Sequence, residues 1–81
     1  MPSVGVTDND AKLVRSLIVD HPERWNGLKQ REQLMMEMRF GLSGRTGRLT
    51  HEAIGAFFSL SRERVRQLVA RSLKILRTGS Q

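Results

Sequence analysis

The sequence contains no cysteine and only two histidines, His21 and His51, among its 81 residues. Without cysteine, disulfide bonds, thiolate-bound metals and a thiol nucleophile are all excluded. The chain also has no glycine-rich phosphate loop, no paired histidines and no plausible acid–base pair. We therefore expect no catalytic residue, no metal ligand and no cofactor, which argues against an enzyme.

Long apolar runs are missing as well. No segment approaches the ~20 residues of a membrane span, and residues 1–5 lack the charged and apolar regions of a signal peptide. The length allows one small domain, which buries only about 60–65% of its unfolded surface. These features predict a compact, helical, cytoplasmic protein with no membrane partner.

The net charge of +6 is unevenly distributed. Residues 1–24 carry a net charge of −1, whereas residues 25–81 carry +7, and six of those cations lie between Ser61 and Arg77. Such clustering is typical of a protein that binds nucleic acid or another acidic surface, although a solvated helix face explains it equally well on charge alone. Eleven of the 14 cations are arginine, whose planar guanidinium suits phosphates and base edges.

We divide the chain into an N-terminal segment, residues 1–24, and a domain over residues 25–81. The first segment predicts an acidic amphipathic helix over residues 8–20, because Thr7 is a good N-cap and four aliphatic residues follow at helical spacing. Residues 1–6 show no periodicity and are expected to be a loose end. Pro22 disfavours helix at the residue before it, so the helix should stop there.

The second segment predicts a central helix over residues 29–40, which contains no Gly or Pro and is apolar on two sides. Gly41 should end it, and residues 43–48 read as a surface loop. Thr50 and Ser61 are N-caps for two further helices joined by about three residues. The predicted fold class is all-α, a small helical bundle of four to five helices that ends in a helix-turn-helix.

The last predicted helix has a strongly basic outward face. Its inward stripe consists of Val65, Leu68, Val69, Ser72, Leu73 and Leu76. The opposite side of its first turns presents Glu63, Arg66 and Gln67, with Arg62 and Arg64 beside them. Arginine can bind guanine O6 and N7, glutamate can accept from cytosine N4, and glutamine can bridge adenine N6 and N7. The helix is therefore a candidate for reading the major groove.

Four stretches together resemble region 4 of bacterial sigma-70 family RNA polymerase sigma factors. They are Arg39-Phe40-Gly41-Leu42, Thr50-x-Glu52-x-Ile54-Gly55, Ser61-Arg62-Glu63-Arg64-Val65-Arg66-Gln67 and Ala70-Arg71-x-Leu73-x-x-Leu76-Arg77. The resemblance runs from about Leu28 to Arg77, with one loop a residue longer, and the seven-residue string is its most specific part. A LuxR-type helix-turn-helix fits this string less well.

The resemblance implies double-stranded promoter DNA with a −35 element and the β flap of RNA polymerase core as partners. Residues implied at base edges are Arg62, Glu63, Arg66 and Gln67. Residues implied near the DNA backbone are Arg31, Arg39, Thr50, Arg64 and Arg71. Residues implied at the flap are Phe40, Leu42, Leu73 and Leu76. For Phe40, Leu73 and Leu76, core packing is at least an equal alternative. The resemblance also allows an anti-sigma factor or a second sigma-like chain as a further partner. It implies a location in the cytoplasm, associated with the nucleoid.

The chain departs from the family pattern at four positions. Lys29 stands where the family has a capping threonine, so the central helix should fray or begin earlier. Ala53 removes the acid of a second capping box. His51 stands where the family usually has a leucine, at a position near the DNA backbone. Nothing in the sequence supports a metal or pH role for it. Phe57 replaces a commonly polar residue and marks a candidate apolar contact.

Two functions remain open from the sequence. The first is a DNA-binding protein of transcription initiation or regulation that recognises a −35 element. The second is an adaptor, or a phage or plasmid regulator, that grips polymerase or a partner sigma or anti-sigma protein with little DNA readout. With only four aromatic residues to capture unpaired bases, we do not expect the chain to open a promoter alone.

Overall fold

A computed structural model describes residues 5–44 and 47–80, and these residues form five helices and no strand. The helices are α1 (Asp8–Asp20), α2 (Pro22–Asn26), α3 (Gln30–Phe40), α4 (His51–Phe58) and α5 (Arg62–Thr78). The predicted all-α class with a terminal helix-turn-helix is confirmed. Residues 1–4 of the predicted loose end and residues 45–46 of the predicted loop lie outside the described residues.

The helix starts agree with the N-caps read from the sequence. The Thr7 hydroxyl oxygen accepts a hydrogen bond from the Asp10 N–H, and the Asp10 carboxylate accepts one from the Thr7 N–H, which makes a complete capping box. The Thr50 hydroxyl oxygen accepts a hydrogen bond from the Ala53 N–H. Ala53 has no carboxylate to accept a second one from the Thr50 N–H, so this capping box is incomplete. Ser61 accepts from the Arg64 N–H. Each cap satisfies a backbone donor that the helix itself leaves without a partner.

The lysine at the start of α3 has a milder effect than the sequence suggested. The helix begins at Gln30, so it does not start earlier. The Glu32 carboxylate accepts from the Lys29 N–H at 3.1 Å, which keeps the acidic half of a capping box. Glu32 is only 4% exposed, because it also lies under Arg71 of α5.

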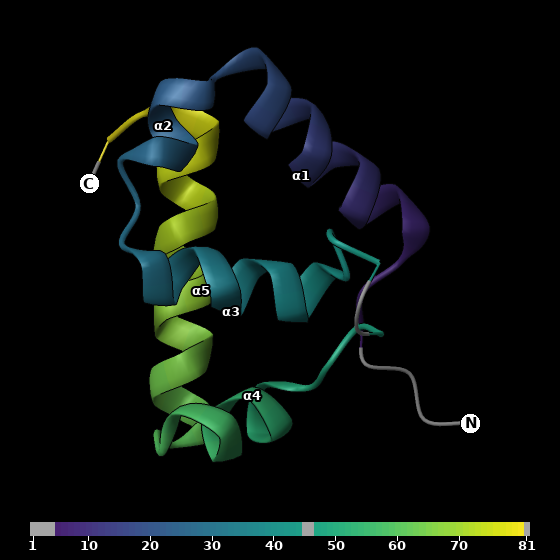
Figure 1. The fold of residues 1–81 in the computed structure, drawn as a ribbon, viewed down its shortest axis with the longest axis vertical. Helices are drawn as coiled ribbons and strands as arrows, with labels where there is room; N and C mark the ends of the chain where they lie inside the picture. Colours follow the sequence, from purple (N-terminus) through teal and green to yellow (C-terminus); the bar gives the residue numbers. More distant parts are fainter. Residues whose placement is uncertain (1–4, 45–46, 81) are drawn as a thin grey trace.

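Helix α5 forms the axis of the molecule, and the other helices are arranged along it (Figure 1). Helix α4 contacts its N-terminal end, α3 crosses its middle, and α2 and α1 lie toward its C-terminal end. The core comes from all these helices except α2, with Val14, Met36, Ile54, Val65 and Leu76 each at most 1% exposed. Burial of this apolar surface is the main force that holds the helices together.

Two contacts tie the N-terminal helices to the rest of the chain. Arg24 of α2 donates to the backbone oxygens of Leu76 and Arg77 at 3.1 and 3.3 Å, so it caps the end of α5. Arg15 of α1 donates to the Gly41 oxygen at 3.3 Å. The predicted division at residue 24 remains a prediction, but α1 shares the core through Ala11 and Val14, which are 0% and 1% exposed.

The predicted inward stripe of α5 is largely correct. Val65, Leu68, Val69, Ser72 and Leu76 are buried, whereas Leu73 is half-buried. Ile75, which was not predicted to belong to the stripe, is 8% exposed and belongs to the core, because α1 and α2 extend the buried surface around the end of α5. Phe57 is 68% exposed on α4.

Candidate nucleic-acid interface

In the turn between α4 and α5, the backbone of Leu60 lies close to Gly55. Ser59 adopts a left-handed conformation with φ of 59°, and the Leu60 N–H donates to the Gly55 oxygen at 2.8 Å. A Cβ atom on residue 55 would lie 2.4 Å from the Leu60 oxygen, so only glycine fits without a backbone shift. This contact sets how α5 leaves α4 and therefore where its first turns point.

The first turns of α5 carry the predicted base-reading residues on the outside of the molecule. Val65 faces inward and is fully buried, which turns the neighbouring polar residues outward. The four residues predicted at base edges, all exposed, are Arg62, Glu63, Arg66 and Gln67. Within the described part of the chain these side chains stay exposed, and they are of the types that can contact base edges in the major groove.

Three of these residues are joined by hydrogen bonds. Arg66 donates to Glu63 through Nε to Oε1 at 2.8 Å and through Nη2 to Oε2 at 2.6 Å. Gln67 Nε2 donates to Glu63 Oε2 at 3.4 Å. The Arg66 hydrogen bond lowers the pKa of Glu63 and in return raises the pKa of Arg66, so both remain charged at neutral pH.

His51, the first residue of α4, lies within the electrostatic reach of this pair. Partial burial lowers the pKa of His51, and the charges of Arg39 and Arg66 lower it further, while Glu63 opposes them. Arg39 donates Nη1 to the Leu49 oxygen at 3.0 Å, and burial lowers its own pKa from a very high value, so it remains a cation. His51 is therefore neutral at pH 7 and sits among cations.

The residues predicted near the DNA backbone lie on three elements. Arg31 and Arg39 are on α3, Thr50 precedes α4, and Arg64 and Arg71 are on α5. Arg71 is half exposed and its Nη1 lies 3.5 Å from the buried Glu32 Oε2. The Thr50 oxygen accepts from Ala53, which leaves its hydroxyl hydrogen available to a phosphate. These assignments stay predictions.

The residues predicted at the polymerase flap divide into two groups. Phe40 and Leu76 are 7% and 0% exposed and belong to the core, whereas Leu42 and Leu73 are half-buried and reach the surface. Leu42 lines an open pocket of about 310 Å³, together with residues that the sequence did not single out. The other lining residues are Arg15, Ile18, Val19, Trp25, Glu37 and Ser43.

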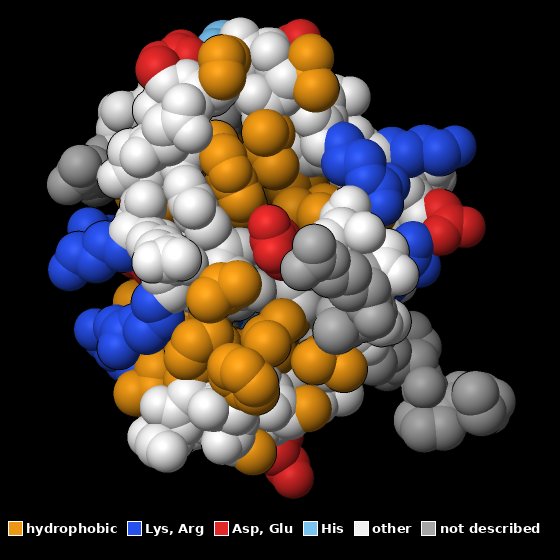
Figure 2. Space-filling view, in the orientation of Figure 1, with side chains coloured by type: hydrophobic (Ala, Val, Ile, Leu, Met, Phe, Trp, Pro, Cys, Tyr) orange, Lys and Arg blue, Asp and Glu red, His pale blue; other side chains and the backbone are white. Residues whose placement is uncertain are grey.

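The sequence missed the pocket because its walls come from three separate segments. Ile18 and Val19 belong to α1, Trp25 to α2, and Glu37 and Leu42 to α3 and the turn after it. Val19 was the one available signal: it lies off the apolar stripe of α1 and is 77% exposed. In Figure 2 the hydrophobic side chains of this face gather in two areas, one between α1 and α3 and one around α4.

The described residues show neither a metal site nor a membrane span. Within residues 5–44 and 47–80, His, Asp and Glu side chains form no group that could hold a metal ion. None of the helices in these ranges is long and apolar enough to span a bilayer.

Comparison with known proteins agrees with this architecture. The family model described as "Sigma-70, region 4" matches residues 26–78. The RNA polymerase sigma factor SigA of Clostridium acetobutylicum is 41% identical over 71 residues, which cover 88% of this chain and 18% of the relative. The RNA polymerase sigma factor RpoD of Neisseria gonorrhoeae is 38% identical over 72 residues, covering 89% of this chain and 11% of the relative.

The chain thus spans less than a fifth of the length of these relatives. No solved structure gave a significant match. The family match contains α3, the whole helix-turn-helix and the exposed residues of α5 described above. This chain belongs to the sigma-70 region 4 family.

Proposed function

We propose that this protein acts in transcription initiation by reading a −35-type promoter element with the first turns of α5. The observation that carries the proposal is the outward display of Arg62, Glu63, Arg66 and Gln67 in front of a tightly packed helix-turn-helix. The curated relatives are named RNA polymerase sigma factors, which supports the same role. The role is that of a binding protein in the cytoplasm, on nucleoid DNA, and not of an enzyme.

DNA binding can be tested with the whole chain and a pool of duplexes that contain ten randomised base pairs. We expect selection to enrich one short motif, and fluorescence anisotropy to show an affinity that falls steeply with salt as cations release phosphate counterions. An Arg66→Ala variant should lose about five- to hundredfold discrimination at one base pair of that motif. No enriched motif, or equal affinity for all duplexes, would contradict the proposal.

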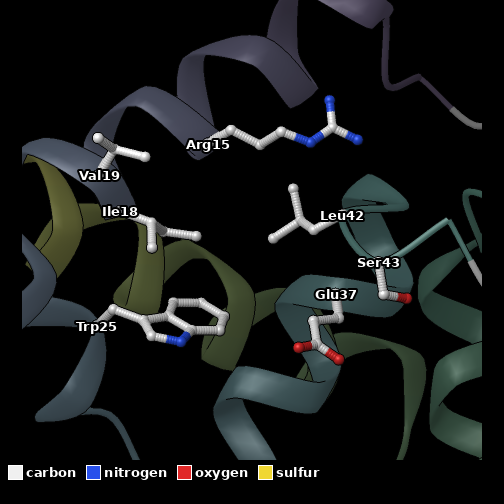
Figure 3. Close-up of a pocket in the computed structure, with 7 residues that line it drawn as sticks. All are labelled: Arg15, Ile18, Val19, Trp25, Glu37, Leu42 and Ser43. Carbon is white, nitrogen blue, oxygen red and sulfur yellow. The ribbon is translucent and has the colours of Figure 1, made fainter.

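We also propose that the protein partner is RNA polymerase core, held at its β flap by the pocket beside Leu42. Figure 3 shows Ile18, Trp25 and Leu42 directed toward the same space, with Arg15 and Glu37 at its edges. An open pocket with apolar walls suits an apolar segment of a partner protein. Of the four predicted flap residues, Leu42 is the one that the pocket supports.

A pull-down with polymerase core and with the isolated flap separates this site from the DNA-reading surface. Val19→Asp places a charge in the pocket without disturbing the core, because Val19 is 77% exposed. Leu13→Asp is the matched control, since Leu13 lies on the same helix, is 52% exposed and does not line the pocket. We expect only Val19→Asp to lose polymerase; equal retention by both variants would remove the pocket from the proposal.

The adaptor function is the second candidate, and the same pocket is the observation that favours it. An adaptor would retain polymerase binding in the Arg66→Ala variant and show no selected DNA motif, whereas a −35 reader would show both activities. Deletion of residues 1–20 cannot distinguish them, because Ala11 and Val14 are part of the core and their loss should unfold the protein. The exposed substitutions on α1 are therefore the better test.

A further inference from the structure

The start of α1 lies against the loop that leads from α3 into α4 (Figure 1). Asp8, the first residue of α1, accepts a hydrogen bond from Nη2 of Arg48 and forms an ion pair with it. The chain just before α1 also passes close to Arg39, because a Cβ atom on Gly5 would lie 3.7 Å from Arg39 Nη2. Residues 5–8 therefore approach two cations that precede α4 in the sequence.

Arg48 belongs to the same stretch as two residues that are predicted near the DNA backbone. Thr50 follows it by two residues and caps α4, and Arg39 donates Nη1 to the oxygen of Leu49 at 3.0 Å. Arginine binds phosphate oxygens through several N–H groups in one plane, so it suits such a place. Arg48 is nevertheless absent from the residues that the family resemblance implies at DNA.

The backbone beside Arg48 does not depend on the ion pair with Asp8. The N–H of Leu49 donates to the Met38 oxygen at 2.9 Å, and the Leu49 oxygen accepts from Arg39. Helix α3 thus holds both backbone polar groups of the residue that follows Arg48. Separation of Arg48 from Asp8 should free one side chain and leave the path of the chain into α4 unchanged.

Asp8 occupies Arg48 in the free protein, but its hold is weak. The hydrogen bond and the charge of Arg48 lower the pKa of Asp8, so the carboxylate is ionised at neutral pH. The Asp8 side chain is 83% exposed and can turn into solvent without loss of packing, whereas that of Arg48 is 31% exposed. Carboxylate and phosphate oxygens compete for the same guanidinium N–H groups, and an exposed ion pair contributes little to stability.

We propose that Arg48 is a further phosphate-binding residue and that Asp8 competes with DNA for its guanidinium. The proposal rests on the proposed DNA-binding function and adds a contact to it. Asp8 lies outside residues 26–78, which the family model matches, so the competition is a property that α1 brings to the domain. Its consequence is that Asp8 lowers the affinity for all duplexes alike and leaves the preferred base pairs unchanged.

The test measures binding of the full chain to the selected duplex and to an unrelated duplex of the same length, by fluorescence anisotropy at several salt concentrations. The proteins are wild type, Asp8→Asn, Arg48→Gln and the double variant of both changes. Asp20→Asn is the matched control, because it removes the same charge from the exposed last residue of α1. Asp10 is left intact because it completes the capping box, and circular dichroism melting curves check that all variants are folded.

We expect Asp8→Asn to bind both duplexes about two- to fivefold more tightly, which is the range that an exposed ion pair allows. Arg48→Gln should bind both more weakly and reduce the slope of log K against log salt by about 0.9. In the Arg48→Gln background, Asp8→Asn should gain no more than Asp20→Asn gains in the wild type. The ratio of the two affinities should be the same in all variants.

Three results would overturn the proposal. If Arg48→Gln binds like wild type, Arg48 does not contact phosphate. If Asp8→Asn gains no more than Asp20→Asn, or gains equally with and without Arg48, the effect is one of net charge. If Asp8→Asn binds more weakly, the pair holds Arg48 ready for DNA instead of withholding it. All three leave DNA reading by α5 standing, whereas equal affinity of the wild type for both duplexes would contradict that reading and leave the Arg48 comparison measurable on either duplex.

Discussion

Two arginine–glutamate pairs lie along α5, and they differ in what holds them. Glu63 and Arg66 are three residues apart on one exposed helix face, with 60% and 54% of their side chains exposed. Glu32 comes from α3 and has a side chain that is only 5% exposed, while Arg71 above it is 49% exposed. The first pair orders side chains without tying the fold together, whereas the second joins two helices across 39 residues of sequence.

This contrast separates the two faces of α5. Its outward face carries exposed polar and charged side chains, whereas its inward face is buried along the helix from Val65 to Leu76. Substitutions on the exposed face should therefore change binding, and substitutions on the buried face should change stability. Four predictions test that division, in order of decreasing effect.

The largest effect should come from Leu76→Ala, on the buried face. Leu76 is 0% exposed, so truncation leaves a cavity and should lower the free energy of unfolding by about 2–5 kcal/mol. Urea denaturation measures the change. Leu73→Ala is the matched control on the same helix and should cost less, because Leu73 is half-buried. Equal losses would show that the end of α5 is less tightly packed than this structure indicates.

A smaller effect is expected from Glu32→Ala. This change removes the acceptor for the Lys29 N–H and the partner of Arg71, and should lower the free energy of unfolding by about 1–3 kcal/mol. Glu63→Ala, which breaks the exposed pair, should leave the melting temperature nearly unchanged. Calorimetry compares the two. If both variants lose the same stability, the distinction between the pairs is wrong.

Arg71→Ala should weaken DNA binding without altering sequence preference. A lost phosphate contact lowers affinity for all duplexes alike and reduces the slope of log K against log salt by about 0.9. Arg77→Ala removes the same charge from the last turn of α5 and should reduce the slope less. Anisotropy titrations at four salt concentrations give both slopes. A change of base preference in Arg71→Ala would contradict its assignment to the backbone.

The smallest expected effect is a shift in the pKa of His51, which depends on the charges of Glu63 and Arg66. Glu63 opposes the lowering of the His51 pKa, so Glu63→Gln should lower that pKa further, whereas Arg66→Ala should raise it toward its ordinary value. An NMR titration of the His51 ring follows both. Glu52→Gln should leave the pKa of His51 where it is, and shifts of the same sign in the two pair variants would contradict the geometry.

The helices and the exposed polar face of α5 could be predicted because their signals are local. Three helix starts were predicted from the N-caps Thr7, Thr50 and Ser61. The central helix ends as expected at Gly41, which adopts the left-handed conformation. Along α5 the apolar period of 3.6 residues placed the exposed arginines correctly without reference to any other helix. Only Ile75 was missed, since its burial depends on where α1 and α2 pack.

The flap prediction shows where local signals stop being sufficient. Phe40, Leu42, Leu73 and Leu76 look alike as apolar residues in a sequence, yet two are buried and two reach the surface. The pocket beside Leu42 depends on Val19 and Trp25, and nothing in the sequence relates those positions to Leu42. Which apolar side chains remain accessible is decided by the neighbours that the fold supplies.

The sequence by itself determined the all-α class, the helix-turn-helix and the placement of the excess positive charge on α5, because caps, glycines and periodicity act within a few residues. Only the tertiary structure decided which glutamate each arginine meets and how exposed that pair is. Arg71 meets Glu32 because α3 crosses α5, whereas Arg66 meets Glu63 on a surface that stays exposed. Burial and long-range contact depend on the whole fold, and so does the difference between a pair that joins two helices and a pair on an exposed surface.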